Sequence, residues 1–207
     1  MLDRMNTKTV VPVAAAAGLI GAALWWRRHP SPCPYGQRFW VQPPHPFITR
    51  ARLRDALDPQ PGDRVLEIGP GTGYYSLDAA AWIGPDGRLD IFDLQQQMLD
   101  HTMRRAAERG LTNITPIQGD ARRLPYPDAT FDAAYLVAVL GEIPDQQAAL
   151  SELARVVKPG GRIVVGELCG DPHWVSPRAL RRHATEAGLH AERRVGRLLG
   201  HYTVLTT

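Results

Sequence analysis

Cysteine is scarce in this chain of 207 residues: Cys33 and Cys169 lie far apart and form no CxxC pair. That pattern excludes a disulfide framework and a zinc knuckle, and it is typical of a reducing compartment. We therefore predict no metal site.

Lysine is almost absent, since Lys8 and Lys158 are the only two. Arginine therefore supplies nearly all the positive charge behind a net charge of +3 and a pI of about 9.1. No helix-turn-helix or RNA-binding signature accompanies this small excess, so no nucleic-acid partner is expected. Six arginines near the C-terminus are interpreted as a solvated face, with contact to a lipid surface as the alternative: Arg178, Arg181, Arg182, Arg193, Arg194 and Arg197.

Long uncharged runs are absent except at the N-terminus, where residues 10–26 read VVPVAAAAGLIGAALWW between Arg4 and Lys8 on one side and Arg27 and Arg28 on the other. As a helix this run would be about 26 Å long, slightly short of a roughly 30 Å hydrocarbon core. Three interpretations stay open: a single-pass anchor, a cleaved secretory signal, and a soluble helix or wrongly chosen start. We treat residues 1–28 as a hydrophobic segment and possible membrane anchor.

Two further regions follow. Residues 29–57 form a lead-in rich in proline and aromatic residues, with no helix before residue 47 and a lid helix over 47–57. Residues 58–207 form one domain in which strands and helices alternate, which predicts a doubly wound α/β sheet. Strands are expected at 64–69, 88–93, 113–118, 131–139, 162–167, 189–194 and 201–206. No helix separates the final two, so the last strand should be antiparallel in an otherwise mostly parallel, Rossmann-like, seven-stranded sheet.

A glycine turn follows the first expected strand in VLEIGPGTGYY, residues 65–75. Ligands of open α/β sheets bind beyond the carboxyl ends of the strands, and a helix N-terminus favours an anionic group. Gly69, Gly71 and Gly73 would let a ligand approach the main chain, close to Glu67. Alone, this turn is also compatible with a nucleotide site or a tight turn.

Carboxylates end the next two strands. Asp93 lies about 20 residues beyond the last glycine, where a carboxylate accepts both hydroxyls of a ribose. Asp120 and Ala121 provide a carboxylate and a main-chain amide to the same cleft, with Leu94 and Met98 as apolar walls. These groups would suit a purine nucleoside.

These residues resemble the class I S-adenosylmethionine-dependent methyltransferases, particularly the small type 11 group related to ubiquinone biosynthesis. The resemblance covers about residues 57–207 and is carried by VLEIGPGTG, IFDLQQQML, QGDARRLPYPDATFD, AAYLVAVLGEI and LARVVKPGGRIVV. It implies methyl transfer from S-adenosylmethionine to a small or lipid-like acceptor. The implied cofactor residues are Glu67 and the three glycines for the methionine part, Asp93 for the ribose, Asp120, Ala121 and Leu94 for the adenine, and Leu136 near the methionine part.

Two other function classes stay open beside this one. A non-catalytic module could bind S-adenosylmethionine with the same fold. An NAD(P)-type oxidoreductase is disfavoured because the glycines follow GPGTG rather than GxGxxG, and because no Tyr-xxx-Lys pair is present.

The acceptor site is expected at loops beyond the strand ends and at the lead-in, which would cover the mouth. Glu142 and His173 are the candidates for the catalytic base, although a loop histidine is more often a hydrogen-bonding or solvent-facing residue. His45, Phe47, Tyr74 and Trp174 are the candidate pocket residues; His45 could instead cap a turn, and Tyr74 and Trp174 could belong to the core.

The N-terminal segment suggests a tether that holds the enzyme beside a hydrophobic acceptor such as a quinone, lipid or isoprenoid. S-adenosylmethionine is intracellular, so we expect the domain at the cytoplasmic face of the membrane. Methylation of oxygen, nitrogen or carbon stays open.

Overall fold

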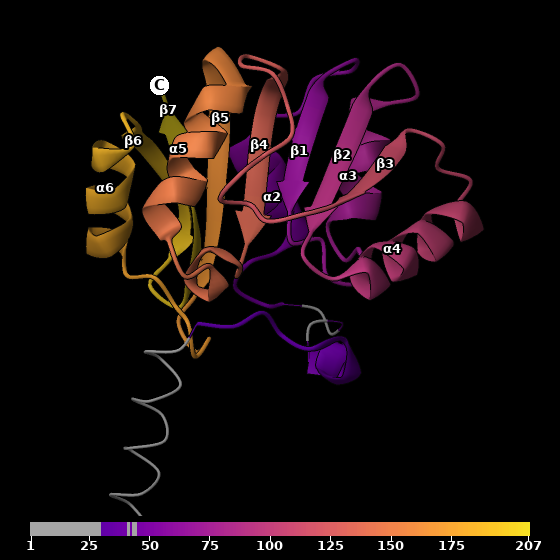
Figure 1. Cartoon of the computed structure of the whole chain (residues 1–207), viewed down its shortest axis with the longest axis horizontal. Helices are drawn as coiled ribbons and strands as arrows, with labels where there is room; N and C mark the ends of the chain where they lie inside the picture. Colours follow the sequence, from indigo (N-terminus) through magenta and orange to yellow (C-terminus); the bar gives the residue numbers. More distant parts are fainter. Residues whose placement is uncertain (1–29, 41, 43–44) are drawn as a thin grey trace, which may run out of the picture.

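The computed structural model describes residues 30–40, 42 and 45–207. A seven-stranded sheet with the order β3-β2-β1-β4-β5-β7-β6 forms its centre (Figure 1). Strand β7 is antiparallel to β5 and β6, and the other pairings are parallel. The strands are β1 (Arg64–Ile68), β2 (Arg88–Asp93), β3 (Ile114–Gln118), β4 (Phe131–Val137), β5 (Val157–Leu168), β6 (His190–Arg197) and β7 (Gly200–Thr206). The predicted fold class is confirmed.

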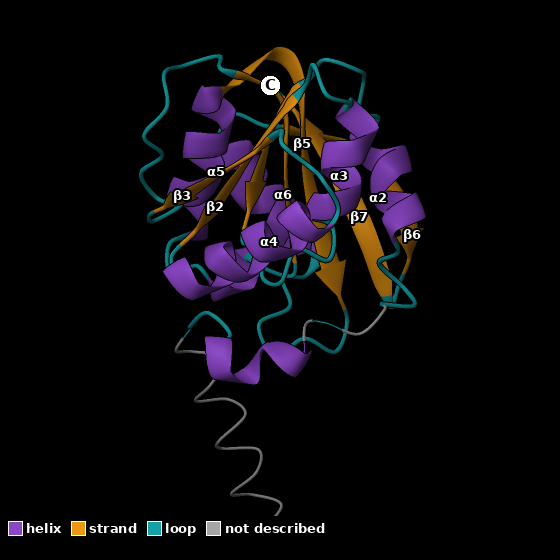
Figure 2. Cartoon of the chain, turned by 90° about the vertical axis from the view of Figure 1, so that its right-hand side faces the viewer, coloured by secondary structure: helices purple, strands orange, loops and turns teal. Residues whose placement is uncertain are grey.

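Helices cover both faces of this sheet, as Figure 2 shows for α5 on one side and α2 and α3 on the other. Buried residues of α2, α3 and α4 share one apolar cluster with the strands, and those of α5 and α6 share the other. The α-helices are α2 (Arg50–Leu57), α3 (Ser76–Ile83), α4 (Gln96–Glu108), α5 (Gln146–Val156) and α6 (Pro177–Glu186); two short 3-10 helices are η1 (Tyr35–Trp40) and η2 (Leu140–Glu142).

Local sequence signals explain where several helices begin. Ser176 caps α6 by accepting a hydrogen bond from the Ala179 amide, and Pro177 occupies the first helical position. Thr49 caps α2 in the same way through the Arg52 amide. Short-range signals therefore set the start of these two helices, while β1, β2 and β4 are buried along nearly their whole length, as expected for a sheet covered on both faces.

The strand order places a crevice at the carboxyl end of β1. Strand β1 pairs with β2 on one side and β4 on the other, so the chain changes direction across the sheet there. This is the topological switch point at which open α/β sheets bind ligands. In Figure 1 the part of the lead-in that contains η1 lies beneath this end of the strands.

The lead-in differs from the sequence-based prediction in two respects. Residues 35–40 form the helix η1, although we expected no helix there; the prolines at 30, 32 and 34 precede it, and the Gln37 amide donates to the Pro34 carbonyl at 2.7 Å. The expected lid helix is the shorter α2, whose Leu53, Ala56 and Leu57 are buried in the core. Helix α2 therefore packs its apolar face on the sheet and does not cover the crevice.

The predicted membrane anchor cannot be placed on this fold, because residues 10–26 lie outside the described residues. Across residues 30–40, 42 and 45–207, no helix combines the length and apolar content needed to cross a bilayer. The transmembrane helix and the membrane association stay predictions.

Candidate functional site

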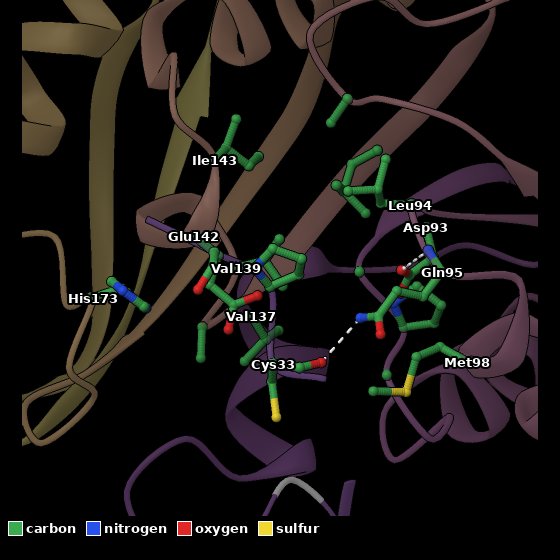
Figure 3. Close-up of a pocket in the computed structure, with 18 of the residues that line it drawn as sticks. Cys33, Asp93, Leu94, Gln95, Met98, Val137, Val139, Glu142, Ile143 and His173 are labelled. Atoms are coloured by element: carbon green, nitrogen blue, oxygen red, sulfur yellow. Dashed lines mark hydrogen bonds between the residues drawn. The ribbon is translucent and has the colours of Figure 1, made fainter. Parts of the chain in front are cut away.

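A cavity of about 630 Å³ opens at the carboxyl ends of β1, β2 and β4. Its size is within the range of small-molecule sites. The glycine turn, the ends of β2 and β4, the loop after β5 and the lead-in contribute to its wall. In Figure 3, Glu142 and His173 lie on one side of this cavity and Asp93, Leu94 and Met98 on the other.

All three glycines of the turn have a backbone conformation with positive φ, which favours glycine. Gly69, Gly71 and Gly73 have φ angles of 68°, 54° and 78°, a region that side chains with a Cβ rarely adopt. Gly69 and Gly71 line the cavity with bare main chain, whereas Gly73 lies behind the turn, where a Cβ would approach Thr102 Cγ2 to 2.9 Å.

Buried polar atoms without hydrogen-bond partners gather around this turn. Glu67 Oε2, Thr72 Oγ1, Ser76 Oγ and Tyr135 Oη have no partner among the residues that the structure describes. Burial raises the pKa of Glu67 to about 7, against the opposing effect of the nearby Ser76 and Tyr135 hydroxyls, which do not reach hydrogen-bonding geometry with Oε2. Such unpaired groups are costly unless a polar ligand or water satisfies them. Thr72 lines the cavity, whereas Glu67, Ser76 and Tyr135 lie behind its wall, so an ordered water would have to connect Glu67 to an ammonium group in the cavity.

Asp93 ends β2 at the cavity and is buried. Its Oδ1 accepts a hydrogen bond from the Gln95 amide at 2.8 Å. Burial raises the pKa of Asp93 to about 6, although nearby main-chain amides pull it down. Leu94 and Met98 line the same side, as predicted for apolar walls, with Leu94 54% exposed.

Asp120 and Ala121 line the cavity beyond β3. The Asp120 carboxylate pairs with Arg122: Oδ2 lies 2.6 Å from Nη2, and Oδ1 lies 3.0 Å from Nε. These hydrogen bonds lower the pKa of Asp120. Because the two side chains are 44% and 42% exposed, the ion pair is a surface one, and the carboxylate can exchange Arg122 for another donor at little cost.

Glu142 and His173 come from loops that follow β4 and β5. Glu142 ends η2, and burial, together with the carboxyl of Asp171, raises its pKa to about 8. Asp171 Oδ1 accepts a hydrogen bond from the His173 amide at 2.7 Å. Both predicted catalytic candidates therefore face one cavity, on the side opposite Asp93.

Of the four predicted pocket residues, two line the cavity and two do not. His45 and Tyr74 line it. Phe47 packs near Gly200 with its side chain 40% exposed, and Trp174 lies outside the lining. Among the predicted cofactor residues, Leu136 points into the core, while Val137 and Val139 line the cavity beside it.

Sequence reasoning missed several lining residues, of which Cys33, Gln95 and Tyr75 have the most specific contacts. Gln95 follows Asp93 by two positions, and a polar residue there could have drawn attention. Its Nε2 donates to the Cys33 carbonyl at 2.9 Å (Figure 3). Its Oε1 accepts from the Tyr35 amide at 3.0 Å. The contact between the lead-in and Gln95 is formed by the fold, because Cys33 and Gln95 are 62 positions apart in the sequence.

A glycine turn on β1 and a buried carboxylate at the end of β2 define a protein that binds a nucleoside cofactor at a Rossmann-like sheet. Comparisons with known proteins narrow this class. A family model described as a methyltransferase domain matches residues 65–161. The chain is 38% identical over 109 residues to the ubiquinone/menaquinone biosynthesis C-methyltransferase UbiE of Teredinibacter turnerae, a match that covers 52% of this chain and 44% of that protein.

Solved structures agree on the fold. A SAM-dependent methyltransferase from Aquifex aeolicus superposes with a TM-score of 0.77 at 19% identity, over 85% of this chain and 100% of that chain. The [4+2]-cyclase SpnF superposes with a TM-score of 0.63 at 26% identity, over 70% of this chain and 58% of that chain. These comparisons show a methyltransferase domain over residues 65–161 and the fold of S-adenosylmethionine-dependent methyltransferases, and they support S-adenosylmethionine as the cofactor. The chain spans less than half of the UbiE relative that it matches.

Proposed function

We propose that this chain transfers a methyl group from S-adenosylmethionine to a carbon atom of a neutral, apolar acceptor of the quinol type. One observation supports this most: a single cavity joins the glycine turn and Asp93 to an apolar wall formed by the lead-in. The relative named as a ubiquinone/menaquinone C-methyltransferase supports the same acceptor class.

The cofactor half of the cavity is assigned first. When bound, S-adenosylmethionine supplies a methyl group on a sulfonium, so a nucleophile can displace the neutral thioether. The main chain of Gly69 and Gly71 would pack against the methionine part, with Glu67 acting on the ammonium through water. Asp93 would accept hydrogen bonds from the ribose, and Asp120 would exchange Arg122 for the adenine amino group, beside the Ala121 amide.

Charge selects a neutral acceptor. Arg122 is the only arginine or lysine among the described residues of the cavity wall, and Asp120 pairs with it. The other half carries the carboxyl groups of Glu142 and Asp171 and, among its described residues, no arginine or lysine, so no described residue there would compensate the charge of a phosphate or carboxylate on the acceptor. Apolar atoms supply most of the cavity surface.

Glu142 and His173 would contact polar atoms of the acceptor. With a pKa of about 8, Glu142 is mostly protonated at pH 7 and can donate a hydrogen bond to an acceptor oxygen. His173 would orient the same end of the acceptor. The lead-in would exclude water and hold the acceptor carbon in line with the methyl group, and such alignment can lower a barrier by up to about 7–11 kcal/mol.

The test is an anaerobic incubation of the chain with isotopically labelled S-adenosylmethionine and 1,4-dihydroxynaphthalene, followed by mass spectrometry. We expect one labelled methyl group on a ring carbon. Cofactor binding without product from this probe, or from a quinol extract of cells, would favour a non-catalytic binding module instead. An O-methyl product would retain the methyltransferase and reject the carbon acceptor.

A further inference from the structure

The hydroxyl of Tyr75 has only one arrangement of its proton that fits the structure. Tyr75 Oη lies 2.6 Å from the main-chain carbonyl oxygen of Ile48, in a buried position. A carbonyl oxygen can only accept, so the Tyr75 proton must lie on this short contact. Tyr202 Oη donates to the same carbonyl at 3.0 Å, which uses its second lone pair.

This arrangement decides which nitrogen of His45 carries hydrogen. His45 Nδ1 lies 3.3 Å from Tyr75 Oη. Because the Tyr75 proton is directed at Ile48, Tyr75 can only accept here, and Nδ1 must donate. The neutral imidazole then has its free lone pair on Nε2. No hydrogen bond from Nε2 to any described residue is present, and His45 lines the cavity.

Ring packing fixes the position of this imidazole. The His45 ring stacks on Tyr75 with an interplanar angle of 15° and a centroid distance of 6.1 Å. It meets Tyr74 edge-on, at 80° and 5.2 Å. Tyr74 and Tyr75 directly follow the glycine turn, so His45 lies over the end of the cavity assigned to the methionine part.

We propose that His45 is the catalytic base that accepts the proton of an acceptor hydroxyl at Nε2. This inference rests on the proposed function. The O–H electron pair stays on the acceptor oxygen and is delocalised to a ring carbon, which forms the new bond to the methyl carbon. The carbon–sulfur pair leaves with sulfur. The ring carbon then loses its hydrogen to solvent as a proton, and the imidazolium returns its proton to the acceptor oxygen, which restores the quinol.

The surroundings of His45 keep it in the base form. Burial lowers the pKa of His45 below its ordinary value, so the ring is neutral at pH 7. The titratable groups that face it are the phenols of Tyr74 and Tyr75, with Arg50 stacked on Tyr74 and paired to Asp78. The phenol of Tyr202 lies beyond Tyr75, at the same Ile48 carbonyl. Glu142, in contrast, is mostly protonated at that pH. The cavity thus holds one group with a lowered pKa, His45, which suits a base, and one with a raised pKa, Glu142, which suits a hydrogen-bond donor.

Nitrogen-15 NMR tests the assignment without any cofactor. In the free protein we expect the His45 ring to show the Nδ1–H tautomer, identified by loss of its signals in His45→Gln. Tyr75→Phe keeps the ring packing and should yield a mixture of tautomers. Addition of anaerobic 1,4-dihydroxynaphthalene should shift the Nε2 resonance as it accepts a hydrogen bond. An Nε2–H tautomer, or an unmoved Nε2 resonance with the probe bound, would overturn the proposal.

Kinetics at saturating cofactor provide the second readout. General-base assistance is typically worth 10²–10⁴-fold, so His45→Gln should lower kcat by about that factor. The Kd for S-adenosylmethionine should stay within about twofold, and the acid limb of the kcat profile should disappear. His190→Gln, an exposed histidine on β6, is the matched control. An unchanged kcat in His45→Gln would contradict only the assignment of His45 as the base. A wild-type chain that methylates no quinol would instead contradict the proposed function.

Discussion

Gln95 connects the cofactor half of the cavity to the lead-in. Its main-chain amide donates a hydrogen bond to Asp93 Oδ1 at 2.8 Å. Its side-chain amide donates to the Cys33 carbonyl at 2.9 Å and accepts from the Tyr35 main-chain amide at 3.0 Å. One residue thus contacts the predicted ribose carboxylate and the segment that covers the acceptor. A ligand that binds Asp93 should therefore also stabilise the lead-in in this position.

Replacing Gln95 should loosen that cover. Gln95→Ala removes two hydrogen bonds, each worth about 0.5–1.5 kcal/mol. We expect amide exchange in residues 30–40 to accelerate by roughly five- to a hundredfold, measured by hydrogen-exchange mass spectrometry. Gln96→Ala is the matched control, because its side chain bonds only Asp100 on the surface of α4. Equal exchange in wild type and Gln95→Ala would show that other contacts hold the lead-in.

Asp93 should dominate recognition of the ribose. Asp93→Ala removes a charged acceptor of hydrogen bonds, worth about 1.5–3 kcal/mol each. Calorimetry should show S-adenosylmethionine binding weakened by at least about tenfold. Asp100→Ala, an exposed acid on the following helix, should bind normally. If both variants keep wild-type affinity, the carboxylate of Asp93 does not contact the cofactor.

Local patterns in the sequence predicted the sheet and the cofactor end of the cavity, because both depend on residues close together in the chain. The order of strand, glycine turn and helix determines where Gly69 and Asp93 lie. Strand β5 begins at Val157 rather than near 162, since Val157 pairs with Phe131 before the register shift. Such boundaries depend on partner strands that the pattern does not contain.

Long-range contacts explain what the sequence did not predict. Gln95 meets Cys33 across 62 positions, and Tyr75 meets Ile48 across 27. Phe47 was expected in the pocket for its aromatic ring, yet the close approach of Gly200 holds it at the edge of the sheet instead. The type of a side chain indicates which interactions it can make, but only the packing of the fold determines which residues line the same cavity.

Glu67 should make cofactor affinity depend on pH. Its pKa of about 7 lies above the ordinary value, and a cationic ammonium favours the ionised form. Affinity for S-adenosylmethionine should therefore rise between pH 5.5 and 7.5, below the 7.7–8.0 range in which α-amino groups titrate.

Two comparisons isolate this effect. Glu67→Gln should remove most of the rise while keeping side-chain size. 5′-Methylthioadenosine lacks the amino-carboxylate part, so its binding should show only the pH dependence that Asp93 contributes near its pKa of about 6. The same slope for both ligands in wild type would exclude the proposed water-mediated interaction between Glu67 and the ammonium.

Glu167 should lower the stability of the ligand-free protein as the pH rises. It is 1% exposed, its Oε2 accepts from the Val175 amide at 2.9 Å, and its Oε1 has no partner among the described residues. Burial raises its pKa to about 8, with Asp171 adding to the effect. The folded state thus retains a proton that the unfolded state loses above pH 4.5, and the free energy of unfolding falls by about 1.4 kcal/mol per pH unit until pH 8.

Urea unfolding at pH 5 and pH 8 measures that loss. Glu167→Gln stays neutral and can still accept from Val175, so the stability difference between the two pH values should shrink by up to about 3 kcal/mol. A smaller slope should persist, because Glu67, Asp93 and Glu142 are also buried acids with raised pKa values. Glu192→Gln, exposed on β6, should behave as wild type. A Glu167→Gln protein with the full wild-type slope would mean that Glu167 is already ionised in the folded state, with its charge compensated by a partner such as His201 on the paired strand.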